Sequence, residues 1–336
     1  MIRIGYLVGT DRDRDIVIDP KANTDLTGAN DANRLLELCD REIFKWSRFH
    51  LPPSYFRKSG GWDVSRVDIL WNMVTDADEN RQVLEVVQKF TDQHRLPIID
   101  PAKEILKTRR HHISDRLAGI DNVTMPRTLL IRNPNLDRVI RQTNEADFRW
   151  PGILRYSGTH NGQYIGVVKS PNDMARIFGD RRNEYYLTEF VDIRRDDGLY
   201  RKTRFFFIGE DVVVRQHLVS DEWNIHGRTS RGLMVSRDDL LDEGRAMLEG
   251  QFEALNPITQ VALHEIRRRI GLEYFGLDAY VDPDGKLVIF EANATMNFKP
   301  DFNNQATQYN RAAVAPAVAA LTKLLYAKVE SRVTNI

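Results

Sequence analysis

The segment that most constrains the fold of this chain lies at residues 274–293. It reads YFGLDAYV, then DPDG, then KLVIFEAN, so two apolar runs flank four residues with Pro second and Gly fourth. That pattern is typical of a β-turn, and the segment therefore predicts a β-hairpin. If those four residues form the loop, Val281 lies opposite Lys286, and Asp278 lies opposite Ile289.

The hairpin ends in polar residues whose side chains share one face. Alternation along a strand puts Glu291 and Asn293 on one side, and the expected pairing adds Ile289 and Asp278, the latter as a diagonal neighbour of Glu291. Two carboxylates and an amide oxygen are hard ligands that favour Mg²⁺ shared with phosphate oxygens over zinc. The alternative is a solvent-facing sheet whose acids are merely hydrated. If the metal interpretation holds, removing either carboxylate should leave unfolding of the ligand-free chain almost unchanged.

The composition limits the class of protein. The chain has 336 residues, enough for two or three structural units, and its 48 Lys and Arg balance 48 Asp and Glu. A net charge of zero gives no overall field that attracts nucleic acid or an anionic membrane. The opening MIRIGYLVG is too short for a secretion signal, and no apolar run approaches the roughly 20 residues of a membrane span. The single cysteine, Cys39, excludes internal disulfides, so we expect a soluble cytoplasmic protein.

Alternating apolar patterns predict three units along the chain. A parallel α/β domain is expected over 1–105, a small α+β unit over 106–188 and a larger α+β unit over 189–336. The elements expected in the first domain are strands at 2–8 and 67–74 and helices at 32–46 and 78–90, and the stretch 96–99 ends the domain. The second unit should contain a helix at 110–119, two strands within 149–170 and a strand at 184–191. The third should contain a hairpin turning at 209–211, a helix along 258–270, the hairpin above, and a helix at 305–328 with a potential bend at Pro316.

Between about 67 and 298 the motifs resemble, in order, those of the ATP-grasp superfamily, in the branch similar to ribosomal-protein glutamate ligase and glutathione synthetase. GLDAYVDPDGKLVIFEANA resembles the final signature of that family. The resemblance implies an α/β fold of three lobes: a parallel N-terminal domain, a central α+β lid and a C-terminal lobe with an antiparallel sheet. It also implies that Asp278, Glu291 and Asn293 bind Mg²⁺, with two ions bridging the phosphates of ATP and Mn²⁺ as a substitute.

Further motifs imply a nucleotide site. YLTEFV resembles the hinge strand whose backbone recognises adenine, GILRYSGTHNGQYIGVV resembles the strand and loop that cover the phosphates, and RKTRFFFIGEDVV resembles a strand that carries a basic residue toward them. The entry to the central lobe resembles IIDPAKEILKTRRHH. The nucleotide-binding residues implied in this way are Arg110, Arg155, Gly158, Gly162, Glu189, Phe190, Val191 and Lys202.

The sequence also departs from the family pattern. The family usually has Lys at the entry segment and on the strand before the loop, where this chain has Arg110 and Arg155. Arginine keeps the charge and can bind phosphate with two hydrogen bonds. An acidic residue common on the basic strand is replaced by Lys202, which leaves ribose recognition open among Asp192, Asp196 and Asp197.

The segment RQHLVSDEWNIHG suggests an acceptor pocket, because the same region faces that pocket in related ligases. Arg215 could bind a carboxylate or the oxyanion of an acyl phosphate, and His217 or His226 could orient or deprotonate an amine. Arg204 is expected to complete the clamp on the phosphates. The alternative is a packed Trp223 with polar neighbours that are satisfied by hydrogen bonds.

The resemblance implies an ATP-dependent carboxylate–amine ligase that works through an acyl phosphate and releases ADP and phosphate. The substrates would be an amino acid, a small peptide or a peptide terminus, with no nucleic acid or membrane partner, and a homodimer is left open. Two alternatives remain: an ATP-dependent phosphotransferase, and a nucleotide-binding regulatory module without catalysis. The change from Lys to Arg supports the module, whereas the intact set of Asp278, Glu291 and Asn293 argues against it.

Overall fold

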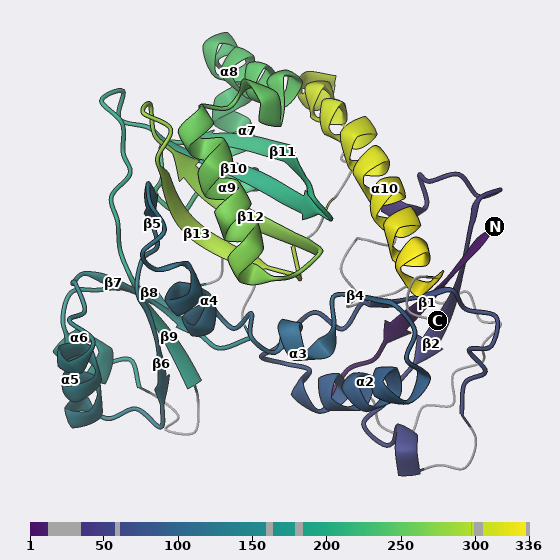
Figure 1. Cartoon of the computed structure of the whole chain (residues 1–336). Coiled ribbons are helices and arrows are strands. Elements are labelled where there is room, and N and C mark those ends of the chain that lie inside the picture. The colour runs from purple at the N-terminus through teal and green to yellow at the C-terminus, as the bar shows by residue number, and fades with distance from the viewer. Residues whose placement is uncertain are drawn as a thin grey trace.

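The computed structural model describes residues 1–12, 35–57, 61–158, 164–178, 184–296, 298 and 305–333. In this part of the chain the strands form three sheets, and helices lie beside each of them (Figure 1). One sheet is parallel and the other two are mainly antiparallel, as expected for the predicted α/β class of three lobes.

The N-terminal sheet is parallel, as predicted, with the strand order β2-β1-β3-β4. Helix α2 buries Val83, Val87 and Phe90 in the core beneath this sheet, which follows from their helical spacing. The elements of this lobe are β1 (Ile2–Val8), β2 (Phe44–His50), η1 (Tyr55–Arg57), β3 (Ile69–Asn72), α2 (Arg81–His94), β4 (Ile98–Ile99) and α3 (Ala102–Ile105).

The helix predicted at 32–46 is wrong in its second half. In the described part of that segment only residues 35 and 36 are helical, and Phe44 begins β2. Leu38, whose spacing from Leu35 favours a helix in this segment, is 44% exposed. The run FKWSRFH begins by alternating large apolar and polar residues, and its pairing with β1 along all seven residues outweighs the helical spacing.

The central lobe is built on the antiparallel order β6-β9-β7-β8. Helix α4 leads into it, as the sequence predicts, and α5 and α6 pack beside its sheet (Figure 1). Its elements are α4 (Arg110–Leu117), β6 (Thr128–Arg132), α5 (Leu136–Glu145), β7 (Gly152–Tyr156), β8 (Gly166–Val168), α6 (Pro171–Ala175) and β9 (Glu184–Glu189).

The C-terminal sheet has the order β11-β10-β12-β13-β5. Strand β5 comes from the segment predicted for the central lobe, yet it pairs in parallel with β13. Phe205 and Leu277 point to the core under α9, whereas Phe206 and Tyr274 point to the opposite core. The elements are β5 (Val123–Thr124), β10 (Tyr200–Ile208), β11 (Asp211–Ser220), α7 (Gly227–Val235), α8 (Asp238–Gly250), η2 (Phe252–Ala254), α9 (Pro257–Ile270), β12 (Tyr274–Val281) and β13 (Leu287–Asn293).

The last helix connects the C-terminal lobe to the N-terminal sheet. A 3₁₀ segment η3 (Gln305–Ala313) precedes α10 (Val314–Val333), which runs from one lobe to the other in Figure 1. Pro316 lies in the first turn of α10, where a missing N–H costs no helical hydrogen bond, so the change of helix type occurs before the proline.

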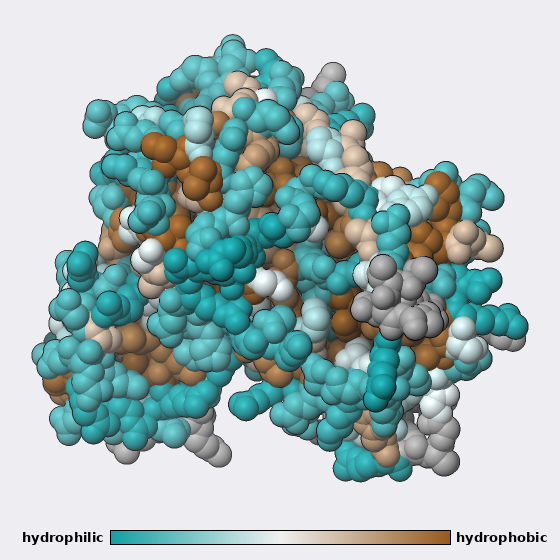
Figure 2. All heavy atoms as spheres, viewed as in Figure 1, coloured by the Kyte–Doolittle hydropathy of each residue, from teal (hydrophilic) through white to brown (hydrophobic). Residues whose placement is uncertain are grey.

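Part of this helix is also long and apolar enough to cross a membrane, contrary to the expectation from the sequence. The stretch Gln308–Ser331 has 24 residues, begins in η3, and 33% of its apolar 18-residue window is buried. A core helix can pass the same test, and here Leu321 and Leu325 are fully buried beside residues of β1 and β3, while Lys323 pairs with Asp211 at 3.0 Å. Packing thus accounts for the apolar side of α10, and hydrophilic residues cover most of the face seen in Figure 2.

A buried carboxylate joins the N-terminal lobe to the C-terminal lobe. Asp100 follows β4 and is fully buried, and its Oδ1 accepts hydrogen bonds from the backbone N–H of Glu273 (2.7 Å) and of Tyr274 (3.1 Å) at the start of β12. Burial raises the pKa of Asp100 to about 7, despite these two donors.

This pKa predicts a pH dependence of stability. The unfolded chain ionises Asp100 near pH 4, whereas the folded chain keeps it protonated up to about pH 7, so its contribution to the free energy of unfolding is lost as the pH rises between these values. The Asp100→Asn variant cannot titrate and should gain stability relative to the wild type between pH 5 and pH 8. Urea unfolding at both pH values measures this, with Asp92→Asn on α2 as the control. An equal pH dependence in all three proteins would contradict the prediction.

Candidate functional site

Asp278 and Glu291 face one another directly on β12 and β13. The predicted pairing of Asp278 with Ile289 is wrong for two reasons. The turn is one residue longer than expected, because Val281 pairs with Leu287 and Asp282 N–H donates to the carbonyl of Lys286 (2.9 Å). A β-bulge at residue 290 then shifts the register again, so Ile289 pairs with Ala279 on the opposite face.

Asp278 is held by two cations from the neighbouring strand β10. Arg204 donates to both of its oxygens (2.6 and 2.8 Å), and the Nζ of Lys202 lies 3.1 Å from Oδ2. The side chain of Asp278 is only 4% exposed. Burial alone would raise the pKa of Asp278, but the charges of Arg204 and Lys202 hold it well below its usual range.

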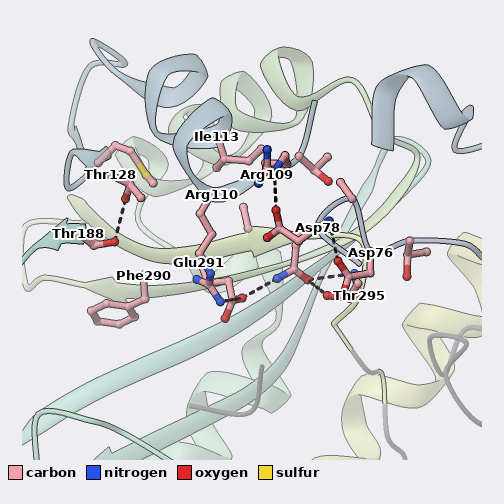
Figure 3. A pocket seen from close by; sticks show the side chains of 16 residues that line it. Asp76, Asp78, Arg109, Arg110, Ile113, Thr128, Thr188, Phe290, Glu291 and Thr295 are labelled. Carbon is pink, nitrogen blue, oxygen red and sulfur yellow. Dashed lines mark hydrogen bonds and ion pairs between the residues drawn. The ribbon is translucent and has the colours of Figure 1, made fainter. Parts of the chain in front are cut away.

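Glu291 is held by a cation from a different lobe. Arg110, the first residue of α4, donates to Glu291 Oε1, and the Nδ2 of Asn293 donates to the same oxygen (2.7 Å). The Oδ1 of Asn293 accepts hydrogen bonds from the N–H (3.0 Å) and hydroxyl (2.8 Å) of Thr295. Figure 3 shows Arg110 reaching down to Glu291 from the helix above.

Asp278, Glu291 and Asn293 offer oxygen donors of the kind that bind a hard cation. Two opposed carboxylates repel each other unless positive charge lies between or beside them, and oxygen donors suit Mg²⁺. In the described part of the chain, no group of three or more His, Cys, Asp or Glu residues could hold a metal. The third oxygen would therefore come from Asn293, whose amide must turn, because it now presents its NH₂ group to Glu291.

A pocket lies beside Glu291 where the three lobes meet, and it opens to solvent. Loop 75–80, after β3, supplies one wall, and α4 and the end of β13 supply the others (Figure 3). It is lined by Thr75, Asp76, Ala77, Asp78, Thr108, Arg109, Arg110, Ile113, Met125, Thr128, Thr188, Phe290, Glu291, Ala292, Asn293 and Thr295. Sequence reasoning missed the loop, although the carboxyl end of a parallel strand is a usual place for ligands.

Arg109 connects the N-terminal loop to the central lobe at this pocket. It donates to Asp78 and to Glu184 (2.8 Å), and the hydroxyl of Tyr186 donates to Asp78 (2.7 Å). The side chains of Arg109 and Asp78 are only 13% and 12% exposed. Burial, together with the Arg109 charge and that of His112, lowers the pKa of the neighbouring His111 to about 4.

Two of the predicted phosphate-binding residues lie on or just after β7: Arg155 is close enough to Arg110 and Glu291 to be affected by their charges, and Gly158 lies against the N-terminal lobe. Burial and the charge of Arg110 lower the pKa of Arg155, on β7, to about 10, against the opposing effect of Glu291. Gly158 has φ +74°, and a Cβ there would lie 2.9 Å from Oε1 of Glu79, so this glycine allows the end of β7 to approach the N-terminal lobe. The predicted Gly162 lies outside the described residues.

The stretch predicted to bind adenine begins at Glu189, the last residue of β9. Glu189 uses its carboxylate within the lobe, because it accepts from the N–H of Arg127 (3.2 Å) and of Arg149 (2.8 Å). The N–H of Phe190 donates to Pro151 (2.9 Å). The Phe190 ring packs against Trp223 with centroids 5.4 Å apart, and Val191 packs beside the same cluster. Because the carboxylate of Glu189 and the N–H of Phe190 already have partners, adenine recognition would use other backbone groups of residues 189–191.

The structure does not bring His217, a predicted catalytic residue, to the face of the sheet that carries Asp278. It pairs with Thr203, whose side chain points away from Asp278, and its ring nitrogens contact the hydroxyl of Thr203 (2.9 Å) and Glu243 (3.1 Å). Arg201 binds Glu243 from the same side. Burial opposes ionisation of Glu243, yet the hydrogen bonds from His217 and Arg201 lower its pKa to about 2.

The other two predicted acceptor residues lie on neighbouring segments. Arg215 is the residue that bulges from β11, and its guanidinium lies 5.1 Å from the ring centre of Phe298, in the core on the Asp278 side of the sheet. His226 precedes α7 and is half-buried. Asp197, one of the three acids considered for ribose, pairs with Arg201 at 2.7 Å.

The Arg109 contacts predict a stability effect. Arg109→Met leaves Asp78 and Glu184 without their shared cation and should lower the free energy of unfolding by about 3 kcal/mol. Chemical denaturation measures the difference, and Arg237→Met, which breaks a pair with the exposed Asp239, is the matched control that should change little. Similar losses in both variants would show that Arg109 contributes no more than a surface pair.

The comparisons with known proteins concern the fold. No described protein family and no curated protein matches the sequence. The VanG D-Ala:D-Ser ligase of Enterococcus faecalis has a TM-score of 0.55 at 11% identity, covering 96% of this chain and 99% of that one. The D-alanine–D-alanine ligase of Coxiella burnetii has 0.57 at 10%, covering 100% and 97%, and a RimK domain ATP-grasp protein of Sphaerobacter thermophilus has 0.51 at 12%, covering 96% and 99%. The chain therefore has the ATP-grasp fold, which confirms the fold predicted from the sequence.

Proposed function

We propose that this chain is an ATP-dependent carboxylate–amine ligase. The observation that carries the proposal is the directly opposed pair Asp278 and Glu291, surrounded by basic side chains at the edge of a pocket between the lobes. Support comes from the shared fold, because two of the similar structures are named as ligases that join D-Ala to a second amino acid. Cytoplasmic location and a homodimer stay predictions from the sequence.

The nucleotide would lie between the central and C-terminal lobes. We assign the adenine to the backbone at Glu189, Phe190 and Val191, and the phosphates to the arginines, lysine and glycines around the metal face, with Gly162 assigned from its sequence motif alone. Asp278, Glu291 and Asn293 would hold Mg²⁺, as one or two ions or replaced by Mn²⁺, and the metal would offset the charge of the phosphates. The residues assigned to the phosphates are Arg110, Arg155, Gly158, Gly162, Lys202 and Arg204.

The reaction would take place in two steps. An oxygen of the substrate carboxylate bonds to the γ-phosphorus while the bond to the bridging oxygen breaks, which gives an acyl phosphate and ADP. The amine nitrogen then bonds to the acyl carbon, and inorganic phosphate and one proton leave. Arg204 and Arg215 would stabilise the negative charge, while the rest of the task is to hold two anions in contact and exclude water.

We assign an amino acid, a small peptide or a peptide terminus as the substrate, as the resemblance of the sequence motifs implies. His226 is the remaining histidine candidate for orienting the amine, because His217 lies on the other face of the sheet. Asp76 places negative charge on the pocket wall, which would attract an amino group, whereas the charge of Asp78 is offset by Arg109.

Product analysis tests this function directly. The protein is incubated with MgATP and pooled amino acids and dipeptides, and mass spectrometry reads ADP, AMP and new condensed masses. We expect ADP together with a condensed mass. A phosphorylated product that needs no second substrate would replace the proposal with phosphotransfer, and MgATP binding without ADP formation over a broad panel would replace it with a regulatory module.

Glu291→Gln is the sharper probe of the metal assignment. It should weaken Mg²⁺-dependent ADP binding at least about tenfold, because one of two carboxylate ligands is lost. Its side chain is 26% exposed, so the ligand-free chain should keep most of its stability. Isothermal titration calorimetry measures the binding, and Asp242→Asn on α8 is the control. Unchanged affinity in Glu291→Gln would end the assignment.

Asp278→Asn should destabilise the ligand-free chain, whereas the sequence alone predicts almost unchanged unfolding. Its carboxylate is the buried partner of both Arg204 and Lys202, so its loss leaves two cations without a counter-charge. We expect a fall of about 3 kcal/mol in the free energy of unfolding even without ligand. Thermal and urea unfolding of the ligand-free protein measure it, and a wild-type unfolding profile would contradict the expectation.

A further inference from the structure

The proposed metal ligands are already neutralised by side chains of the chain itself. Asp278 and Glu291 carry two negative charges, and Arg110, Lys202 and Arg204 contact them with three positive charges. These five side chains therefore have an excess of one positive charge. An isolated divalent cation is repelled by such a cluster, whereas a polyphosphate is attracted to it.

Arg110 differs from the other two cations in its origin. Lys202 and Arg204 lie on β10, in the same sheet as Asp278, and the pairing of β10 with β12 fixes them there. Arg110 begins α4, which leads into the central lobe, and reaches Glu291 across 181 residues of sequence. Its side chain is 20% exposed at the edge of the pocket, so it can leave Glu291 without disrupting a strand.

Arg110 also lies close enough to Arg155 for the two side chains to attract one phosphate group together. Its charge acts on Arg155, which lies on β7 and is part of the proposed phosphate site, so the two guanidinium groups repel each other across this face. A polyphosphate placed between them would relieve that repulsion and accept hydrogen bonds from both. Glu291 would then lose its side-chain cation at the moment when phosphate oxygens and a metal arrive.

We propose that Arg110 is an internal counter-ion that occupies the place of the metal at Glu291 until a nucleotide draws it away, so that metal and nucleotide bind cooperatively. The inference rests on the proposed nucleotide site and adds to it how that site is regulated. Metal alone should bind weakly, and nucleotide should raise the affinity for metal. By linkage, metal should raise the affinity for nucleotide by the same factor.

The first test uses Mn²⁺ alone, with binding followed by electron paramagnetic resonance in the absence of nucleotide. Arg110→Met removes the competing charge and should tighten Mn²⁺ binding at least about tenfold over the wild type. The double variant Arg110→Met with Glu291→Gln should lose that gain. Arg268→Met breaks an Arg–Glu pair on α9 and serves as the matched control, which should bind Mn²⁺ like the wild type.

Thermal unfolding of each variant verifies its folding, and Arg110→Lys gives a second test if the methionine variant is unstable. Lysine keeps the positive charge beside Glu291, so this variant should bind Mn²⁺ as weakly as the wild type. Equal Mn²⁺ affinity in wild type and Arg110→Met, or a gain that persists in the double variant, would overturn the proposal.

The second test uses ADP with and without Mn²⁺. In the wild type, saturating ADP should tighten Mn²⁺ binding at least about tenfold. In Arg110→Met this factor should be smaller, because the part contributed by the counter-ion is gone while the attraction between metal and phosphate remains. An undiminished factor in the variant would overturn the proposal. This test is separate from the test of catalysis. Tighter Mn²⁺ binding in the variant without any condensed product would support the counter-ion proposal and contradict the ligase proposal. A condensed product without tighter Mn²⁺ binding would support the ligase proposal and contradict the counter-ion proposal.

Discussion

The structure depends on the two carboxylates that face each other across β12 and β13. Like charges in directly opposed positions destabilise a sheet, so Asp278 and Glu291 require positive charge nearby. Strand β10 provides it on one side, since Arg204 pairs with Asp278 in register, and α4 provides it on the other through Arg110. The ion pairs that neutralise these carboxylates therefore join the C-terminal sheet to the entry of the central lobe. They also place basic residues where an anionic ligand would bind.

Other contacts between the lobes also involve charged side chains. Arg109 joins Asp78 of the N-terminal loop to Glu184 of the central sheet, and Asp100 joins β4 to the start of β12. Each contact links segments that are far apart in sequence. The pocket exists because these contacts hold three separately folded sheets around one space, and the proposed chemistry needs such a space to bring two anions together away from water.

The sequence predicted much of this arrangement, and its errors have physical causes. The hairpin was foreseen, but its register was not, because a longer turn and a bulge at residue 290 each shift it by one. The helix at 32–46 failed because strand pairing overrode a helical spacing. His217 was predicted to orient an amine because its segment faces the acceptor pocket in related ligases, yet strand alternation turns it toward Glu243 and away from Asp278.

What the sequence determined by itself is local. Turn chemistry, alternation and motif order specify the hairpin, its metal-type ligands and the ATP-grasp fold, because each depends on residues close together in the chain or in a fixed order. Only the tertiary structure decided which cations neutralise those ligands, that Asp76, Asp78 and Arg109 line the pocket, and that His217 is excluded. These features arise from strand order and from contacts such as Arg110 with Glu291, whose residues are 181 positions apart and have no pattern that links them before the chain folds.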